Sequence, residues 1–474
     1  MERAELENVV AAVAEEARSY LARLDDGAVL EDSAAALQLG GSLPEEGSGA
    51  TAALRELLSA SPAATRSPGP RFFHFVTGGV TPAAFGADWL TTLLDQNSFS
   101  WVSSPFGARL ETLAIDWLKQ LFDLPSDWAG VLTTGATTAN LTGLAAGRRW
   151  WAARHGVDVD AAGLAGLPPV PVFSSGYIHS SAIKALGMLG LGRETVRTFA
   201  RDDVGSLDAE ALERALAELD GAPAILVGNA GDVNSGDFDR IDHLADLAER
   251  YGAWLHVDGA FGLFARLAPG VAPLAAGVER AHSVIADGHK WLNVPYDCGF
   301  AFLRITPSEL ERTFSLAGAY LPSDDKPNFG YRGPEASRRA RALAVWATLR
   351  AYGRSGYREM VERHLALAQR LARRVEDAPD LELLAPAKLN IVCFRLHPPG
   401  TDASELDGLN ARLGEAILED GRVYAGTTAY GGRMALRPAI VNWRTREEDV
   451  DFFVDVVREL GASVATPASR GRAG

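Results

Sequence analysis

Apolar residues recur at helical spacing from Leu6 to Leu24, which predicts an amphipathic helix at the start of the chain. The apolar stripe of such a helix needs a partner surface, and another subunit is one candidate. Residues 40–70 are rich in Gly, Ser and Pro and indicate a linker with one short helix over residues 51–59. We therefore expect residues 1–69 to form a helical and linker segment that packs at a subunit interface.

The middle of the chain has a different pattern. From about residue 70 to residue 330, short apolar strands alternate with helical stretches, as in βαβ units around a mostly parallel sheet. We assign residues 70–337 to one large α/β domain. Residues 338–462 are expected to form a long helix, broken near Gly353 and Gly356, and a smaller C-terminal α+β domain. Residues 463–474 are expected to be a disordered tail.

The composition is that of a globular protein with a large core: of 474 residues, 47% are hydrophobic and 23% charged. A net charge of −15 argues against a general role on nucleic acids or anionic membranes. The start of the chain is acidic, unlike a secretion signal, and no apolar run approaches the length of a membrane helix. Cys298 and Cys393 are expected to be buried thiols in a reducing compartment. These features predict a cytoplasmic protein without nucleic-acid or membrane partners.

One βαβ unit places a polar residue at the edge of the predicted sheet. A strand over residues 224–227 is followed by a helix over residues 241–251, a capping Gly252 and a strand over residues 254–257. Asp258 therefore falls at the carboxyl end of a strand. In open α/β sheets this is the edge where ligands bind.

A lysine follows a second strand in the same way. Residues 283–287 read as a strand that runs into a polar turn ending at Lys290. An amine there can form a Schiff base with an aldehyde cofactor, and pyridoxal 5′-phosphate (PLP) also needs a carboxylate under its pyridine nitrogen, which Asp258 can supply. The Thr- and Gly-rich residues 132–140 lead into a helix and suit a phosphate. Taken singly, each feature has an ordinary alternative: a solvated lysine, a helix cap and a turn. No metal site is expected, because the chain lacks the common metal-binding motifs.

Together these motifs resemble the group II PLP-dependent decarboxylases, the family of aromatic-L-amino-acid, histidine and glutamate decarboxylases. The resemblance covers about residues 70–460, and its most specific parts are His-Val-Asp-Gly-Ala, residues 256–260, and His-Lys-Trp-Leu, residues 289–292. It implies the PLP-dependent transferase fold type I, in which the large domain binds PLP. It also implies an obligate homodimer with active sites at the subunit interface.

Position by position, the resemblance implies that Lys290 is the Schiff-base lysine and that Asp258 is the partner of the pyridine nitrogen. His179 would stack on the cofactor ring, and its alternative reading is a core or capping histidine. The remaining implied cofactor contacts are the phosphate-loop residues Ala136 and Thr137, the small residue Ala260, and His289 before the lysine.

The chain departs from the animal aromatic decarboxylases at Asp287, which replaces an Asn that contacts the phosphate. The Asp287 carboxylate would oppose a phosphate dianion, so we expect this cofactor-pocket residue to face a neighbouring Arg or Lys. The substrate side is ambiguous as well. Phe72 and Phe99 favour an aromatic or bulky apolar substrate, whereas His74 and Asn97 favour a polar one.

The reaction that the resemblance implies is loss of the α-carboxylate of an L-amino acid as CO2, through the Lys290 Schiff base and a quinonoid intermediate, to give the amine. In the family, a tyrosine on a loop from the neighbouring subunit returns a proton to Cα. Residues 316–337 suit such a loop, with Tyr331 as the best match and Tyr320 as the alternative. Other fold-type I activities remain open, namely an aminotransferase, a lyase or an amine-oxidising aldehyde synthase, as does a non-catalytic PLP-binding protein.

Overall fold

The computed structural model describes residues 2–316, 318 and 326–465. Its largest sheet has seven strands in the order β1-β7-β6-β5-β4-β2-β3. Strands β2 to β6 pair in parallel, and β7 is antiparallel to both β1 and β6. The prediction of a mostly parallel central sheet is therefore confirmed. The strands are β1 (Ala129–Thr133), β2 (Val172–Ser174), β3 (Val196–Thr198), β4 (Ile225–Asn229), β5 (Trp254–Asp258), β6 (Ser283–Asp287) and β7 (Gly299–Leu303).

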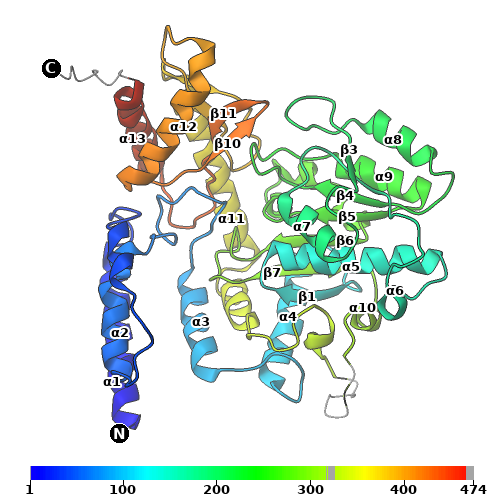
Figure 1. Cartoon of the computed structure of the whole chain (residues 1–474), viewed down its shortest axis with the longest axis horizontal. Coiled ribbons are helices and arrows are strands. Elements are labelled where there is room, and N and C mark those ends of the chain that lie inside the picture. The colour runs from blue at the N-terminus through cyan, green and yellow to red at the C-terminus, as the bar shows by residue number, and fades with distance from the viewer. Residues whose placement is uncertain (1, 317, 319–325, 466–474) are drawn as a thin grey trace.

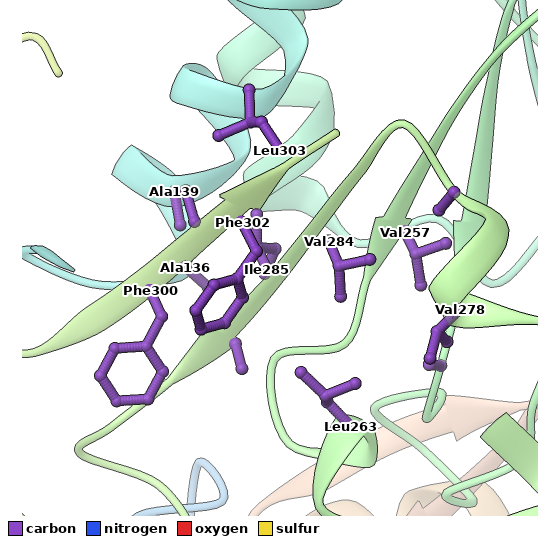
Figure 2. Packing of buried hydrophobic residues seen from close by; sticks show 14 of the residues in the cluster. Ala136, Ala139, Val257, Leu263, Val278, Val284, Ile285, Phe300, Phe302 and Leu303 are labelled. Atoms are coloured by element: carbon purple, nitrogen blue, oxygen red, sulfur yellow. The ribbon is translucent and has the colours of Figure 1, made fainter. Parts of the chain in front are cut away.

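The central strands are buried on both faces, which is why their sequences are continuous apolar runs. Helix α5 (Ala136–Arg154) contacts β5, β6 and β7. Figure 2 shows Ala136 and Ala139 of this helix beside the strand residues Ile285 and Phe302. The close packing of small residues brings the first turn of α5 down onto the end of β6.

Helices surround the sheet (Figure 1). The elements of the large domain are α3 (Pro82–Leu94), α4 (Pro105–Leu121), α6 (Val159–Ala162), α7 (Ser180–Met188), α8 (Ala209–Ala217), α9 (Ile241–Tyr251) and α10 (Pro307–Thr313). The helix expected over residues 241–251 is confirmed as α9, and Gly252 ends it with a φ of 62°. Short 3-10 helices include Gly262–Leu267 and Phe329–Tyr331.

The long helix α11 (Ala342–Glu376) is kinked at Gly353, where φ is 59°, as the sequence predicts. Its residues before the kink pack in the core of the large domain, and Leu367 and Leu371 after it pack in a second core. That second core covers an antiparallel sheet in the order β10-β11-β9-β8. Its elements are β8 (Leu381–Leu383), β9 (Phe394–Leu396), α12 (Ala403–Asp420), β10 (Thr427–Tyr430), β11 (Arg433–Leu436) and α13 (Glu447–Ala465).

The α+β character expected of this smaller domain is confirmed. Helix α13 extends to Ala465, three residues into the segment expected to be a disordered tail, and residues 466–474 lie outside the described residues.

The N-terminal helices α1 (Glu2–Arg23) and α2 (Ala50–Ser59) agree with the predicted helices. They form a pair, drawn in blue in Figure 1, that stands beside α3 and away from the central sheet. Leu6 and Val10 on α1 are exposed. Among the described residues, no helix has both the length and the apolar character needed to cross a membrane.

Candidate active site

Lys290 and Asp258 lie at the same edge of the sheet. Asp258 is the last residue of β5 and pairs in register with Ile285 of β6, whereas Lys290 lies in the turn that follows β6. The Lys290 Nζ atom is 3.1 Å from the Asp287 Oδ2 atom and 5.7 Å from the ring centroid of Phe261. The parallel arrangement of β5 and β6 therefore brings together an amine and a carboxylate that are 32 positions apart in the sequence.

A series of hydrogen bonds holds the Asp258 carboxylate in place. Asp258 is buried, with 6% of its surface exposed. The Asn140 Nδ2 atom donates to Asp258 Oδ2 over 2.9 Å, and the Ala260 N–H donates to Asp258 Oδ1 over 3.1 Å. The Asn140 Oδ1 atom accepts from His256 Nε2 over 2.8 Å. Because an amide oxygen only accepts, His256 must carry its proton on Nε2.

At the other end of this series of hydrogen bonds, each donor again points toward Asp258. The Trp254 Nε1–H donates to Ser283 Oγ over 3.1 Å, and Ser283 Oγ is 2.8 Å from His256 Nδ1. Because an indole N–H only donates, the Ser283 hydroxyl proton is free to point at His256 Nδ1. Burial lowers the pKa of His256 to about 4, so its ring is neutral near pH 7. The orientation of the Asn140 amide, and hence of Asp258, is thus set from inside the protein.

His179 is joined to the same network. It is the N-cap of α7, where its Nδ1 atom accepts from the Ser181 N–H over 3.2 Å and lies 2.7 Å from Ser181 Oγ. Asn140 Nδ2 also donates to Ser181 Oγ over 3.2 Å. Burial lowers the pKa of His179, which Asp258 opposes and Lys290 reinforces. His179 therefore caps α7, which was one of the two readings of the sequence. The capping hydrogen bonds fix its ring where the charges of Asp258 and Lys290 act on it.

The first turn of α5 meets the end of β6. Gly135 is the N-cap of α5, with Ala136 and Thr137 as the first two helical residues. The Ala136 N–H donates to Asp287 Oδ1 over 2.6 Å. Asp287 also faces a basic neighbour, as expected, because the Lys290 Nζ atom lies 3.1 Å from its Oδ2 atom.

His289 lines the same corner. Its Nδ1 atom accepts from the Cys298 N–H over 3.2 Å, its ring stacks on Tyr296 at 4.2 Å, and its Nε2 atom is 3.5 Å from Asp287 Oδ1. Burial lowers the pKa of His289. Since Nδ1 accepts a hydrogen bond, the neutral ring has its proton on Nε2, facing Asp287.

The residues expected on the substrate side fall into two groups. Phe72 packs against Tyr424 at 5.8 Å and lies 6.4 Å from the His74 ring. Burial, followed by the nearby Arg437 charge, lowers the pKa of His74 to about 4. Phe99 instead makes an edge-to-face contact with Tyr331 at 5.3 Å.

The turn before Phe99 is tied to the segment that follows the predicted loop. Asn97 Oδ1 accepts from the Phe99 and Arg338 N–H groups. The Arg338 side chain forms a buried ion pair with Glu111 over 2.7 Å. Tyr320, the alternative loop tyrosine, lies outside the described residues.

Sequence reasoning assigned no role to Asn140, His256 or Tyr296. Two of them carry a recognisable signal. Asn140 lies one helical turn after Ala136, and His256 lies two residues before Asp258, so both fall on the same face as a candidate site residue. A polar residue on an otherwise apolar buried face is the observation that could have identified them.

Fold and site together define a PLP-dependent enzyme of fold type I, and the comparisons agree. A family model described as pyridoxal-dependent decarboxylase conserved domain matches residues 56–397. The chain is 29% identical to an aromatic-L-amino-acid decarboxylase of Bacillus atrophaeus, over 84% of this chain and 82% of that protein. It is 30% identical to an L-2,4-diaminobutyrate decarboxylase of Rhizobium meliloti (strain 1021), over 90% and 85%.

The fold is similar to the crystal structure of Oryza sativa TDC with PLP and tryptamine, with a TM-score of 0.86, 26% identity and 97% of each chain covered. The chain belongs to the pyridoxal-dependent decarboxylase family, whose members are PLP-dependent carboxy-lyases.

The donor set fits PLP at three points. Lys290 offers an amine, Asp258 a carboxylate whose two oxygens are already oriented, and the start of α5 the backbone N–H groups that favour a phosphate. The fit is imperfect at one point, because the Asp287 carboxylate accepts the Ala136 N–H at this helix start. Among the described residues, no group of three or more His, Cys, Asp or Glu side chains is arranged to hold a metal ion.

Proposed function

We propose that this chain removes the α-carboxylate of an L-amino acid as CO2 and releases the amine, with Lys290 as the residue that binds PLP covalently. The observation that carries this proposal is the joint position of Lys290 and Asp258 at the ends of two adjacent parallel strands. When bound, PLP supplies an electron sink for the bond that is broken.

The residues of this chain have separate tasks in the proposal. Asp258 would hold the proton of the pyridine nitrogen, because Asn140 and the Ala260 N–H keep its carboxylate in a fixed orientation. His179, anchored by its hydrogen bonds to Ser181, would stack on the cofactor ring. Ala136 and Thr137 at the start of α5 would hold the phosphate. The small side chain of Ala260 would leave room for the ring.

We assign the return of a proton to Cα to Tyr331 of the neighbouring subunit, with Tyr320 as the alternative. The contact between Phe99 and Tyr331 supports this assignment, since a substrate-lining aromatic ring and the proton donor would enter the partner's site together. A tyrosine at this position favours the amine as product. An aldehyde synthase is the alternative. It differs in consuming dioxygen and water and in releasing an aldehyde, ammonia and hydrogen peroxide along with CO2.

For the substrate we propose an L-amino acid with an aromatic or bulky apolar side chain. Phe72, Phe99 and Tyr331 support this class, as does the similarity to the Bacillus atrophaeus enzyme. His74 is the feature that would suit a polar substrate. Its ring is disfavoured as a cation, because burial and Arg437 lower its pKa to about 4.

We also propose a homodimer with shared active sites, in the cytoplasm. Exposed apolar side chains on α1 and α3 support the dimer, since a monomer leaves Leu6 64% and Leu93 75% exposed. A groove of about 550 Å³ between these elements, lined by residues such as Leu21 and Phe85, continues the apolar surface. The cytoplasmic location rests on the two cysteines, Cys298 and Cys393, which are both buried and free.

The test compares Lys290→Ala with Lys184→Ala, because Lys184 is an exposed lysine on α7 and controls for nonspecific reaction with PLP. Each purified protein is incubated with PLP, reduced with borohydride and mapped by mass spectrometry. CO2, amine and aldehyde are measured with a panel of L-amino acids. We expect the wild type and Lys184→Ala to carry PLP on Lys290 and to release CO2 and amine.

Lys290→Ala should lose at least about a thousandfold in turnover. An aldehyde as the main product would replace the decarboxylase proposal by the synthase. PLP on Lys290 without CO2 release from any amino acid would support a non-catalytic PLP-binding protein. PLP attached elsewhere would remove the assignment of Lys290.

A further inference from the structure

Asp287 holds together the two ends of the proposed cofactor site. Its side chain is 3% exposed, and its two oxygens have different partners. Oδ1 accepts from the Ala136 N–H over 2.6 Å at the start of α5, and Oδ2 is 3.1 Å from Lys290 Nζ. A single carboxylate thus contacts both a helix N-terminus and the amine that is expected to bind the cofactor.

This position sets up a competition. Backbone N–H groups at a helix start attract an anion, and the helix dipole adds to that preference. A phosphate bound at α5 would need the Ala136 N–H that Asp287 already uses, and it would lie within a few ångströms of a second negative charge. Like charges at that distance oppose one another strongly when both are shielded from water.

The structure also contains a third partner for Asp287. His289 Nε2, which carries the proton of the neutral ring, lies 3.5 Å from Asp287 Oδ1. The His289 ring is held by the Cys298 N–H and by stacking on Tyr296. A small rotation of the Asp287 carboxylate would exchange the Ala136 N–H for the imidazole N–H, and would release the helix start to the phosphate.

We propose that Asp287 is a built-in competitor of the cofactor phosphate, which lowers the affinity of this chain for PLP and gives way by moving onto His289. The inference deepens the proposed function and rests on its placement of the phosphate at α5. It predicts that the carboxylate weakens binding of PLP but has little effect on pyridoxal, the same aldehyde without the phosphate.

The test is the dissociation constant of PLP and of pyridoxal for the wild type and for Asp287→Asn. Asparagine has the same shape without the charge, and its amide can turn to donate to a phosphate. We expect Asp287→Asn to bind PLP about tenfold more tightly or better, and pyridoxal with less than about threefold change. Asp297→Asn is the matched control, because Asp297 pairs with Arg341 over 2.6 Å and does not touch the start of α5.

The same measurements in a Lys290→Ala background separate the phosphate effect from the ion pair with Lys290. The tenfold gain for PLP should persist there. Unchanged PLP affinity in Asp287→Asn, or an equal gain for PLP and pyridoxal, would overturn the inference. A gain in Asp297→Asn of the same size would also overturn it, since the effect would then be one of general charge.

A further variant and a stability measurement control for misfolding of Asp287→Asn. Asp287→Glu keeps the charge on a longer side chain, so it should not reproduce the gain in PLP affinity, while thermal unfolding reports whether each variant is folded. The result is independent of catalysis. A protein that shows the phosphate-dependent gain but releases no CO2 would contradict the proposed function and leave the role of Asp287 supported.

Discussion

The edge of the central sheet and the face formed by α1 and α3 differ in whether a single chain supplies partners for their side chains. At the sheet edge, the Asp258 oxygens and the Asn140 amide have hydrogen-bond partners within the chain, and the residues are buried. On α1 and α3, Leu6 and Leu93 are exposed to solvent. One chain therefore forms the hydrogen-bonded cofactor side of the candidate site by itself, whereas the apolar side chains on α1 and α3 remain exposed to solvent. In the proposed homodimer, a second chain would cover that face and bring Phe99 and Tyr331 to the site.

The largest effect should come from the loop tyrosine. Tyr331→Phe removes the hydroxyl proposed to return the proton, so amine formation should fall about 100-fold, as for loss of a general acid. In air, with dioxygen as the oxidant, aldehyde should appear in place of the amine. PLP binding should be unchanged, because the cofactor side is formed by other residues. Amine and aldehyde are quantified by chromatography, with Tyr320→Phe as the matched variant. The loss of amine in Tyr320→Phe alone would transfer the role to that residue.

A smaller effect should follow from a charge on the exposed face of α1. Val10→Asp places a carboxylate on the apolar stripe, and losing the burial of one such side chain costs about 2 kcal/mol, or about 30-fold in the dimer dissociation constant. Sedimentation measures the constant, and activity on dilution should fall in parallel if the sites are shared. Ala11→Asp, exposed and about 100° around the helix from Val10, off the apolar stripe, should change neither. An unaltered dimer in Val10→Asp would place the interface elsewhere.

A pH-dependent effect is expected on the stability of the hydrogen-bond chain behind Asp258. The pKa of His256 is about 4 in the folded protein against 6.5 ordinarily, so between these values the unfolded chain binds the extra proton. This contribution to stability is complete above about pH 6.5 and is lost progressively as pH falls toward 4.

His256→Gln keeps a donor for Asn140 and should make the free energy of unfolding less steep between pH 7 and pH 5. Denaturant titrations at several pH values measure this slope, with the exposed His155 changed to Gln as the control. Equal slopes in the two variants would mean that His256 is not buried as a neutral ring.

Much of the fold could be predicted because most helices and strands are encoded by short stretches of sequence. The helix α9 and its cap Gly252 were predicted at their observed positions, since amphipathic spacing and a terminal glycine are both short-range signals. The parallel strands were predicted as continuous apolar runs for the same reason. The kink at Gly353 followed from a glycine inside a helical pattern.

The candidate site was predictable only in part. Lys290 and Asp258 belong to contiguous motifs at strand ends, so the sequence is enough to predict them as cofactor-binding residues. The role of Asn140 was missed, because its contact with His256 joins residues 116 positions apart. No local pattern distinguishes a buried asparagine that orients a carboxylate from one that caps a turn.

Local spacing was enough to predict the order of the elements and a mostly parallel sheet, and contiguous motifs were enough to suggest a PLP site and, through the family resemblance, the fold type. Two contacts became visible only in the folded chain: Asp287 reaches the start of α5, 151 positions away, and Phe99 lies against Tyr331. The physical reason is that such contacts arise where strand ends and helix starts converge in the packed sheet, and a carboxylate has no preferred partner until that packing brings one within hydrogen-bond distance.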